Sequence, residues 1–177
     1  PAVSELRHRA DQYLIDLYAE TRPLELFDKT GDEDFAYSMD EHSRFRINIL
    51  RDNNGVSAVF RHIPNTIFSL QDLGMPDTLR KWAEMPKGLI LVTGPTGSGK
   101  STTLAAMIDH INRTRECHIL TIEDPIEFVH KSKNSLVNQR EVNVHTESFA
   151  RALKAALRED PDVVLVGEMR DLETISM

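Results

Sequence analysis

The sequence predicts an α/β fold with a parallel sheet, preceded by a small α+β module. Two observations carry this prediction. After residue 87, strand-like and helix-like segments alternate, which is typical of a parallel sheet. Before residue 64, an amphipathic helix precedes three strand-like segments. We therefore expect a partial N-terminal α+β domain at residues 1–75, a linker at 76–87 and a truncated α/β domain at 88–177.

The N-terminal module is expected to combine one helix with a small sheet. Residues 4–20 place apolar side chains such as Leu14 and Leu17 at helical spacing, with charges on the other faces. Residues 21–34 form a polar, turn-like stretch. Strands are expected at 35–39, 44–50 and 56–63, and the Asn54-Gly55 pair between the last two predicts a hairpin.

The second half begins after a segment punctuated by proline and glycine, residues 64–87, which holds the domain boundary and a short helix at about 78–83. The expected strands are 89–92, 119–122, 135–142 and 163–166. The expected helices are 102–112 and 146–159. The second helix should stop at Asp160, because the residue before a proline avoids helical geometry.

A phosphate-binding loop is the strongest signal in the chain. The sequence GPTGSGKS matches the G-x-x-x-x-G-K-S pattern and lies between an apolar run and a helix-favouring segment. Backbone N–H groups of such a loop surround phosphates, the lysine reaches the β and γ oxygens, and the serine hydroxyl can ligate magnesium. The expected binding residues are Gly94, Pro95, Thr96, Gly97, Ser98, Gly99, Lys100, Ser101 and Thr102.

Acidic residues follow two of the expected strands. Glu123 and Asp124 come after 119–122, and Glu168 comes after 163–166. In an open parallel sheet, ligands sit at the carboxyl ends of strands, so these acids should face the γ-phosphate. We assign Glu168 to the magnesium shell and Glu123 to polarisation of the attacking water, and these two roles could be exchanged. Taken singly, either acid could also be a turn residue.

Four arginines gather on the predicted hairpin: Arg44, Arg46, Arg51 and Arg61. Arg44 and Arg46 share one face of their strand, because side chains alternate with period two. An arginine near the γ-phosphate is a recurring way to neutralise the charge of the transition state. From spacing alone, a solvated, charged hairpin is the better account.

Composition limits the classes of function. The net charge is −7, which argues against nonspecific nucleic-acid binding. Cys117 is the only cysteine, so no disulfide partner is expected within the chain, and Cys117 is read as a small packing residue. No apolar run approaches the roughly eighteen residues of a membrane span.

The motifs together carry a family resemblance. Besides the P-loop, the stretches HILTIEDPIEF, LVNQREV and ALREDPDVVLVGEMRDLETI resemble the secretion-type (type II/IV) hexameric ATPases, and most closely their pilus retraction branch. The resemblance extends weakly to SRFRINILRDNNGVSAVFRHIP. It implies a RecA-like P-loop NTPase core behind a partial PAS-like domain, with ATP and Mg²⁺ as ligands.

The resemblance also implies roles for individual residues. TIEDPIE matches the aspartate box of the family, which supports Glu123 and adds Asp124 and Glu127; VVLVGEMRD matches its Walker B segment, which supports Glu168. Arg46 and Arg61 fall on positions where the family takes arginines from the N-terminal domain to neutralise nucleotide phosphates. The histidine box of the family has no match, so the chain is expected to be a fragment truncated at both ends, with weak or absent ATP turnover.

The leading hypothesis is an ATP-hydrolysing motor of the type IV pilus system that drives pilus retraction and twitching motility. The resemblance implies a cytoplasmic homo-hexamer peripheral to the inner membrane, with a pilus inner-membrane platform protein as partner. Three alternatives stay open: a pilus extension or type II secretion ATPase, a nucleic-acid motor, and a non-hydrolysing nucleotide-binding regulator. The acidic charge counts against the second, and the presence of both Glu123 and Glu168 counts against the third.

Overall fold

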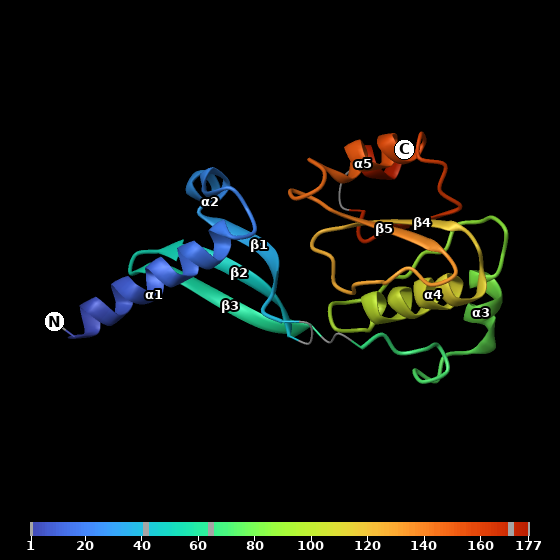
Figure 1. Ribbon diagram of the computed structural model, residues 1–177, viewed down its shortest axis with the longest axis horizontal. Coiled ribbons are helices and arrows are strands. Elements are labelled where there is room, and N and C mark those ends of the chain that lie inside the picture. Colours follow the sequence, from blue (N-terminus) through green and yellow to red (C-terminus); the bar gives the residue numbers. More distant parts are fainter. Residues whose placement is uncertain (1, 41–42, 64–65, 170–171, 177) are drawn as a thin grey trace.

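The computed structural model describes residues 2–40, 43–63, 66–169 and 172–176. It contains two units that lie side by side (Figure 1). The N-terminal unit is an antiparallel sheet covered by a long helix, and the second unit is a parallel sheet with helices on both faces. The predicted fold class, a parallel α/β core preceded by a small α+β unit, is therefore confirmed.

The N-terminal unit consists of α1 (Ala2–Ala19), α2 (Leu24–Thr30), β1 (Asp32–Ser38), β2 (Arg44–Asp52) and β3 (Gly55–Ile63). The strand order is β1-β2-β3, and the predicted hairpin joins β2 to β3. Tyr18 of α1 packs between Phe27 and Phe35, and all three rings are buried. Because apolar residues alternate along β1 and β2, one face of this sheet forms the core beneath α1.

Helix α2 corrects the reading of residues 21–34 as a turn-like stretch. The segment 24–30 is mostly polar and only seven residues long, so its apolar periodicity was too short to indicate a helix. Its buried residue is Phe27, which packs under α1, and Gly31 ends the helix with a left-handed conformation, φ 78°. Tertiary packing of one side chain therefore decides the conformation of this segment.

The second unit contains α3 (Asp77–Ala83), α4 (Lys100–Thr114), β4 (His118–Glu123), β5 (Leu136–Glu141), α5 (Phe149–Ala156), β6 (Val163–Val166) and α6 (Leu172–Ser176). The sheet is parallel with the order β5-β4-β6. Leu70 and Ala83 pack with α4, so part of the segment between the two sheets contributes to this core. Cys117 also packs against it, as expected. The division of domains at residues 75 and 87 stays a prediction.

The central strand β4 separates two apolar layers. Ile119 packs with Ala106, Met107 and Ile111 of α4, whereas Ile122 packs with Ala152 of α5. Because side chains alternate across a strand, Thr121 and Glu123 lie on the same face as Ile119, the face toward α4. This alternation turns Glu123 toward the P-loop helix.

The expected strand at 89–92 is not part of a sheet, and this prediction is wrong for the structure. Within the described residues, no strand pairs with this segment or with the second edge of β6. Leu89 and Leu91 are 81% and 59% exposed. A parallel strand requires a hydrogen-bonded neighbour to persist, and an apolar sequence alone does not supply one.

None of the helices among the described residues is both long enough and apolar enough to cross a membrane. Helix α5 is shorter than the predicted 146–159: it begins after Ser148, whose side-chain oxygen accepts a hydrogen bond from the Arg151 N–H. This is a regular N-cap. The helix also ends earlier than predicted, at Ala156, and residues 157–159 form a turn before Asp160, which has φ 50°.

Candidate functional site

The P-loop forms the connection into α4. Gly94, Gly97 and Gly99 have positive φ angles of 149°, 81° and 86°, which side chains with a Cβ rarely adopt. At Gly94 a Cβ would also lie 2.8 Å from the Ser98 hydroxyl oxygen. The glycines in this pattern are therefore required by the backbone conformation that turns the loop into the first turn of α4.

Lys100 begins α4, and its side chain folds back over the loop. Its ammonium group donates hydrogen bonds to the carbonyl oxygens of Gly94 (2.9 Å) and Pro95 (3.0 Å). An ammonium group is a point charge with three donors on a flexible stem, so it can also serve an anion within the loop. Ser101 follows in the first helical turn, where the positive end of the helix dipole favours negative charge.

A cavity of about 480 Å³ lies next to this loop and brings together residues from both units. From the P-loop, it is lined by Thr96, Gly97, Gly99, Lys100, Ser101 and Thr102. From the strand ends, it is lined by Glu123, Asp124, Glu127 and Glu168. From the N-terminal unit, it is lined by Arg46 and Arg61. Gly94, Pro95 and Ser98, which were also expected to bind phosphate, lie in the loop but outside this lining.

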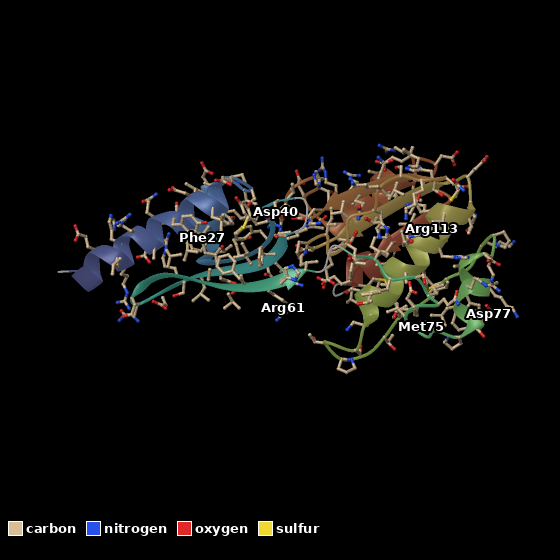
Figure 2. All side chains as sticks on the ribbon, turned by 60° about the horizontal axis from the view of Figure 1, so that its bottom comes forward. Phe27, Asp40, Arg61, Met75, Asp77 and Arg113 are labelled. Atoms are coloured by element: carbon tan, nitrogen blue, oxygen red, sulfur yellow. The ribbon has the colours of Figure 1, made fainter. Side chains whose placement is uncertain are left out.

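Arg61 lies near the end of β3 closest to the second unit (Figure 2). Arg46 pairs with Arg61 across β2 and β3, so the register of the hairpin sets both residues side by side. Arg51, by contrast, is paired with Asp28 within the N-terminal unit at 2.8 Å. Of the four arginines of the hairpin, Arg46 and Arg61 therefore line the cavity.

Glu123 is held by three donors. The Thr121 hydroxyl and the Gln139 side-chain amide donate to its Oε1 at 2.6 and 3.2 Å, and the Glu127 N–H lies 3.4 Å from its Oε2. Burial raises the pKa of Glu123, and these hydrogen bonds oppose that rise. The carboxylate is thus oriented and basic, which suits a group that accepts a hydrogen bond from water.

Arg46 connects the two units at the cavity. Its guanidinium donates to Asp34 at 2.6 Å and to Glu127 at 3.4 Å. The hydrogen bond to Asp34 is the main cause that raises the pKa of Arg46. Burial raises the pKa of the neighbouring Asp124. A positive charge therefore lies against the aspartate box.

A second contact between the units is buried. Glu141, at the end of β5, accepts a hydrogen bond from Arg22 at 3.2 Å and lies 3.8 Å from the guanidinium of Arg44. The second oxygen of Glu141 accepts from the Ile126 N–H at 3.0 Å. Arg44 and Arg46 share a strand face, as predicted, but Arg44 serves this ion cluster rather than the cavity.

His130 is a buried residue that lines the cavity. Burial lowers the pKa of His130 to about 4, so the ring is neutral at physiological pH. Its Nδ1 has no hydrogen-bond partner among the described residues. No pattern in the sequence indicates a role for His130, since a single histidine after the aspartate box matches no metal or catalytic spacing.

The oxygen donors at the cavity fit a magnesium ion. Mg²⁺ is usually held by one or two protein oxygens together with phosphates and water. The Ser101 hydroxyl and the Glu168 carboxylate, both of which line the cavity, are donors of this kind. Among the described residues, no three His, Cys, Asp or Glu side chains are grouped closely enough to hold a metal by themselves. The fit therefore depends on phosphate oxygens as further ligands.

Sequence reasoning did not single out Thr121, Gln139, Glu141 or Arg22. Gln139 lies 16 residues from Glu123, on a different strand, and only the parallel pairing of β4 with β5 brings them together. The NQREV stretch carries part of the family resemblance, but its spacing indicates no chemistry by itself. The signal that could have found these residues is the register of the sheet.

The fold and the cavity define a P-loop NTPase with a RecA-like α/β core. The chain belongs to the type II/IV secretion system protein family, whose model matches residues 31–177. It is 59% identical over 152 residues to a twitching motility protein of Neisseria gonorrhoeae, covering 86% of this chain and 41% of that protein. It is 56% identical over 151 residues to the type IV pilus retraction ATPase PilT of Pseudomonas aeruginosa, covering 85% and 44%.

Solved structures give the same result. A crystal structure of the pilus retraction motor PilT with bound ADP matches with a TM-score of 0.81 and 54% identity, covering 86% of this chain and 44% of that one. The Legionella pneumophila ATPase DotB matches with a TM-score of 0.83 and 32% identity, covering 94% and 49%. The chain thus spans less than half the length of these relatives.

Proposed function

We propose that the protein carrying this chain is an ATP-hydrolysing motor of the type IV pilus system that drives pilus retraction. The observation that carries the proposal is the cavity in which a P-loop, acidic strand ends and arginines of the N-terminal unit meet. The similarity to PilT supports retraction over pilus extension or type II export.

The residues of the cavity have separate tasks in this proposal. The N–H groups of the P-loop and the Lys100 ammonium hold the β- and γ-phosphates, and Lys100 leaves the carbonyls of Gly94 and Pro95 to do so. Glu123 accepts a proton or a hydrogen bond from the attacking water. Arg46 and Arg61 neutralise charge on the phosphates from the side of the N-terminal unit.

Magnesium, when bound, would supply positive charge that offsets the negative charge of the phosphates. Ser101 and Glu168 are the residues that would hold it. Glu123 is the last residue of β4 and Glu168 follows β6, which is adjacent to β4, so the two acids approach the phosphates from neighbouring positions. Their roles could still be exchanged, and substitution of each will distinguish them.

The position of the nucleotide between two units suggests how hydrolysis is coupled to motion. Arg46 belongs to one unit and Glu127 to the other, so a nucleotide that competes for Arg46 changes the contact between them. We propose that the full-length protein forms a cytoplasmic homo-hexamer at the inner membrane. There it acts through a platform protein on pilin subunits.

The test is ATP turnover by the full-length protein in the presence of Mg²⁺, with its mass in solution recorded. We expect a hexamer whose ATP turnover is abolished by Lys100→Ala and by Glu168→Gln. The parent protein should then restore twitching in a strain that lacks the gene. Nucleotide binding without turnover by a monomer would favour the non-hydrolysing regulator instead.

A further inference from the structure

The carboxylate of Glu123 receives two hydrogen bonds on the same oxygen. Thr121 precedes it by two residues on β4, and Gln139 is the register partner of Thr121 on β5. Both therefore lie on the face of the sheet toward α4, and both donate to Oε1, at 2.6 and 3.2 Å. Thr121 is fully buried, so its hydroxyl does not contact solvent.

The orientation of the Gln139 amide is fixed by its other bonds. Its Oε1 accepts a hydrogen bond from the backbone N–H of His130 at 2.7 Å, and its Nε2 donates to the Phe128 carbonyl at 2.9 Å. A flipped amide would set an oxygen against that carbonyl and against the Glu123 carboxylate. The backbone of the loop after the aspartate box therefore forces the amide to present its N–H to Glu123.

The second oxygen of Glu123 is in a different situation. Oε2 has one long contact, 3.4 Å from the Glu127 N–H, while the residue lines the cavity beside the P-loop. Two donors on one oxygen fix the plane of the carboxylate and leave the other oxygen available for a further donor. Water is a donor of this kind.

We infer that Thr121 and Gln139 are positioning residues that hold Glu123 Oε2 toward the attacking water. This inference rests on the proposed function, because it assigns the orientation of the group that polarises the water. Loss of such support typically costs about 10- to 100-fold in activity, since misplacement of a reacting group by an ångström is enough.

A purely structural role for the same residues makes a different prediction. Gln139 also joins the loop 124–130 to β5, so its loss could disturb nucleotide binding as a whole. Gln139→Glu keeps an acceptor for the backbone N–H of His130 but removes the donors to both Glu123 and the Phe128 carbonyl, so the separation of the two roles rests on Thr121. Thr121→Val removes the hydroxyl at nearly constant volume, whereas Thr121→Ser keeps it.

The experiment measures kcat and KM for Mg-ATP, together with ADP affinity, in the full-length protein. The matched control is Asn138→Leu on the same strand, since Asn138 is bonded to His118 and lies on the opposite face from Gln139. We expect kcat to fall about 10- to 100-fold in Thr121→Val and Gln139→Glu, with KM and ADP affinity within about threefold of the parent. Thr121→Ser and Asn138→Leu should retain kcat within about threefold.

Unchanged kcat in Thr121→Val, or an equal loss in Thr121→Ser, would overturn the inference. So would a loss of ADP affinity that parallels the loss of kcat. If the parent protein shows no turnover, the proposed function fails by itself, and crystal structures of the parent and the Thr121→Val, Gln139→Glu double variant decide the inference. A Glu123 carboxylate that rotates in the variant supports it, and one that stays in place refutes it.

Discussion

Glu141 is the buried acid that joins the two units, and its replacement gives the sharpest prediction on stability. Its side chain is 7% exposed, and its partners Arg22 and Arg44 are 1% and 11% exposed. Arg22 Nε, Arg44 Nε and Arg44 Nη1 lack hydrogen-bond partners in the described part of the chain. Burial lowers the pKa of Arg44, and Glu141 is the main group that opposes this effect.

The magnitude follows from these contacts. Removing one partner of a buried ion pair leaves an uncompensated charge and costs about 3–5 kcal/mol. Arg22 retains Glu33 at 3.5 Å, so we expect the lower end, about 3 kcal/mol, for Glu141→Gln. Asp28→Asn is the control, because the Arg51–Asp28 pair is solvent-exposed and should contribute less than about 1 kcal/mol.

The assay is urea denaturation followed by circular dichroism and by the emission of Trp82, which reports on the second unit. A double-mutant cycle with Arg22→Met isolates the interaction from the effects of the single substitutions. Losses for Glu141→Gln and Asp28→Asn that agree within about 0.5 kcal/mol would refute the reasoning, since burial would then have no consequence.

Three further predictions concern the cavity. Lys100→Ala should weaken ADP binding about 10- to 100-fold in calorimetry, because the ammonium group holds phosphate oxygens. It should leave the free energy of unfolding unchanged, because the hydrogen-bond partners of the Lys100 side chain are exposed loop carbonyls. Equal ADP affinity of parent and variant would contradict this. Gly94→Ala should strain the loop by about 1–3 kcal/mol, given φ 149° and the Ser98 hydroxyl 2.8 Å from a Cβ, and should reduce ADP affinity, which the same titration measures. The pKa of His130 falls from 6.5 to about 4 on folding. As pH drops from 6.5 toward 4, the unfolded chain therefore binds a proton that the folded chain does not, and the free energy of unfolding decreases. About 2 kcal/mol of the decrease in the free energy of unfolding between pH 7 and 5 should be absent in His130→Leu. Parallel plots of the free energy of unfolding against pH for parent and variant would exclude His130 as the cause.

The parts of the fold that sequence predicted are those with a local signal. The hairpin at Asn54-Gly55, the amphipathic α1 and the glycine-rich start of α4 each depend on residues close together in the chain. The prediction of a strand at 89–92 was wrong because a strand needs a hydrogen-bonded partner, and no partner is present among the described residues. Helix α2 was not predicted, because it is stabilised by the packing of one buried ring, Phe27, and not by a local sequence pattern.

The candidate site divides in the same way. Lys100, Glu123 and Glu168 follow from a motif and from the rule that ligands bind at the carboxyl ends of strands. Arg44 and Arg46 were indistinguishable by spacing, and their different partners depend on how the two units meet. Thr121 and Gln139 could be found only once the register of β4 and β5 was known.

The central claim is that the cavity between the P-loop and the acidic strand ends binds a nucleotide, with Arg46 and Arg61 on the side of the N-terminal unit. Calorimetric titration of the full-length protein with ADP and with a non-hydrolysable ATP analogue tests it most directly. The account predicts one nucleotide per chain and nucleotide binding that is about 10- to 100-fold weaker in Lys100→Ala. It also predicts a larger loss of affinity for the ATP analogue than for ADP in the Arg46→Ala, Arg61→Ala variant. Undiminished binding by Lys100→Ala, or equal losses of both ligands in the arginine variant, would contradict it.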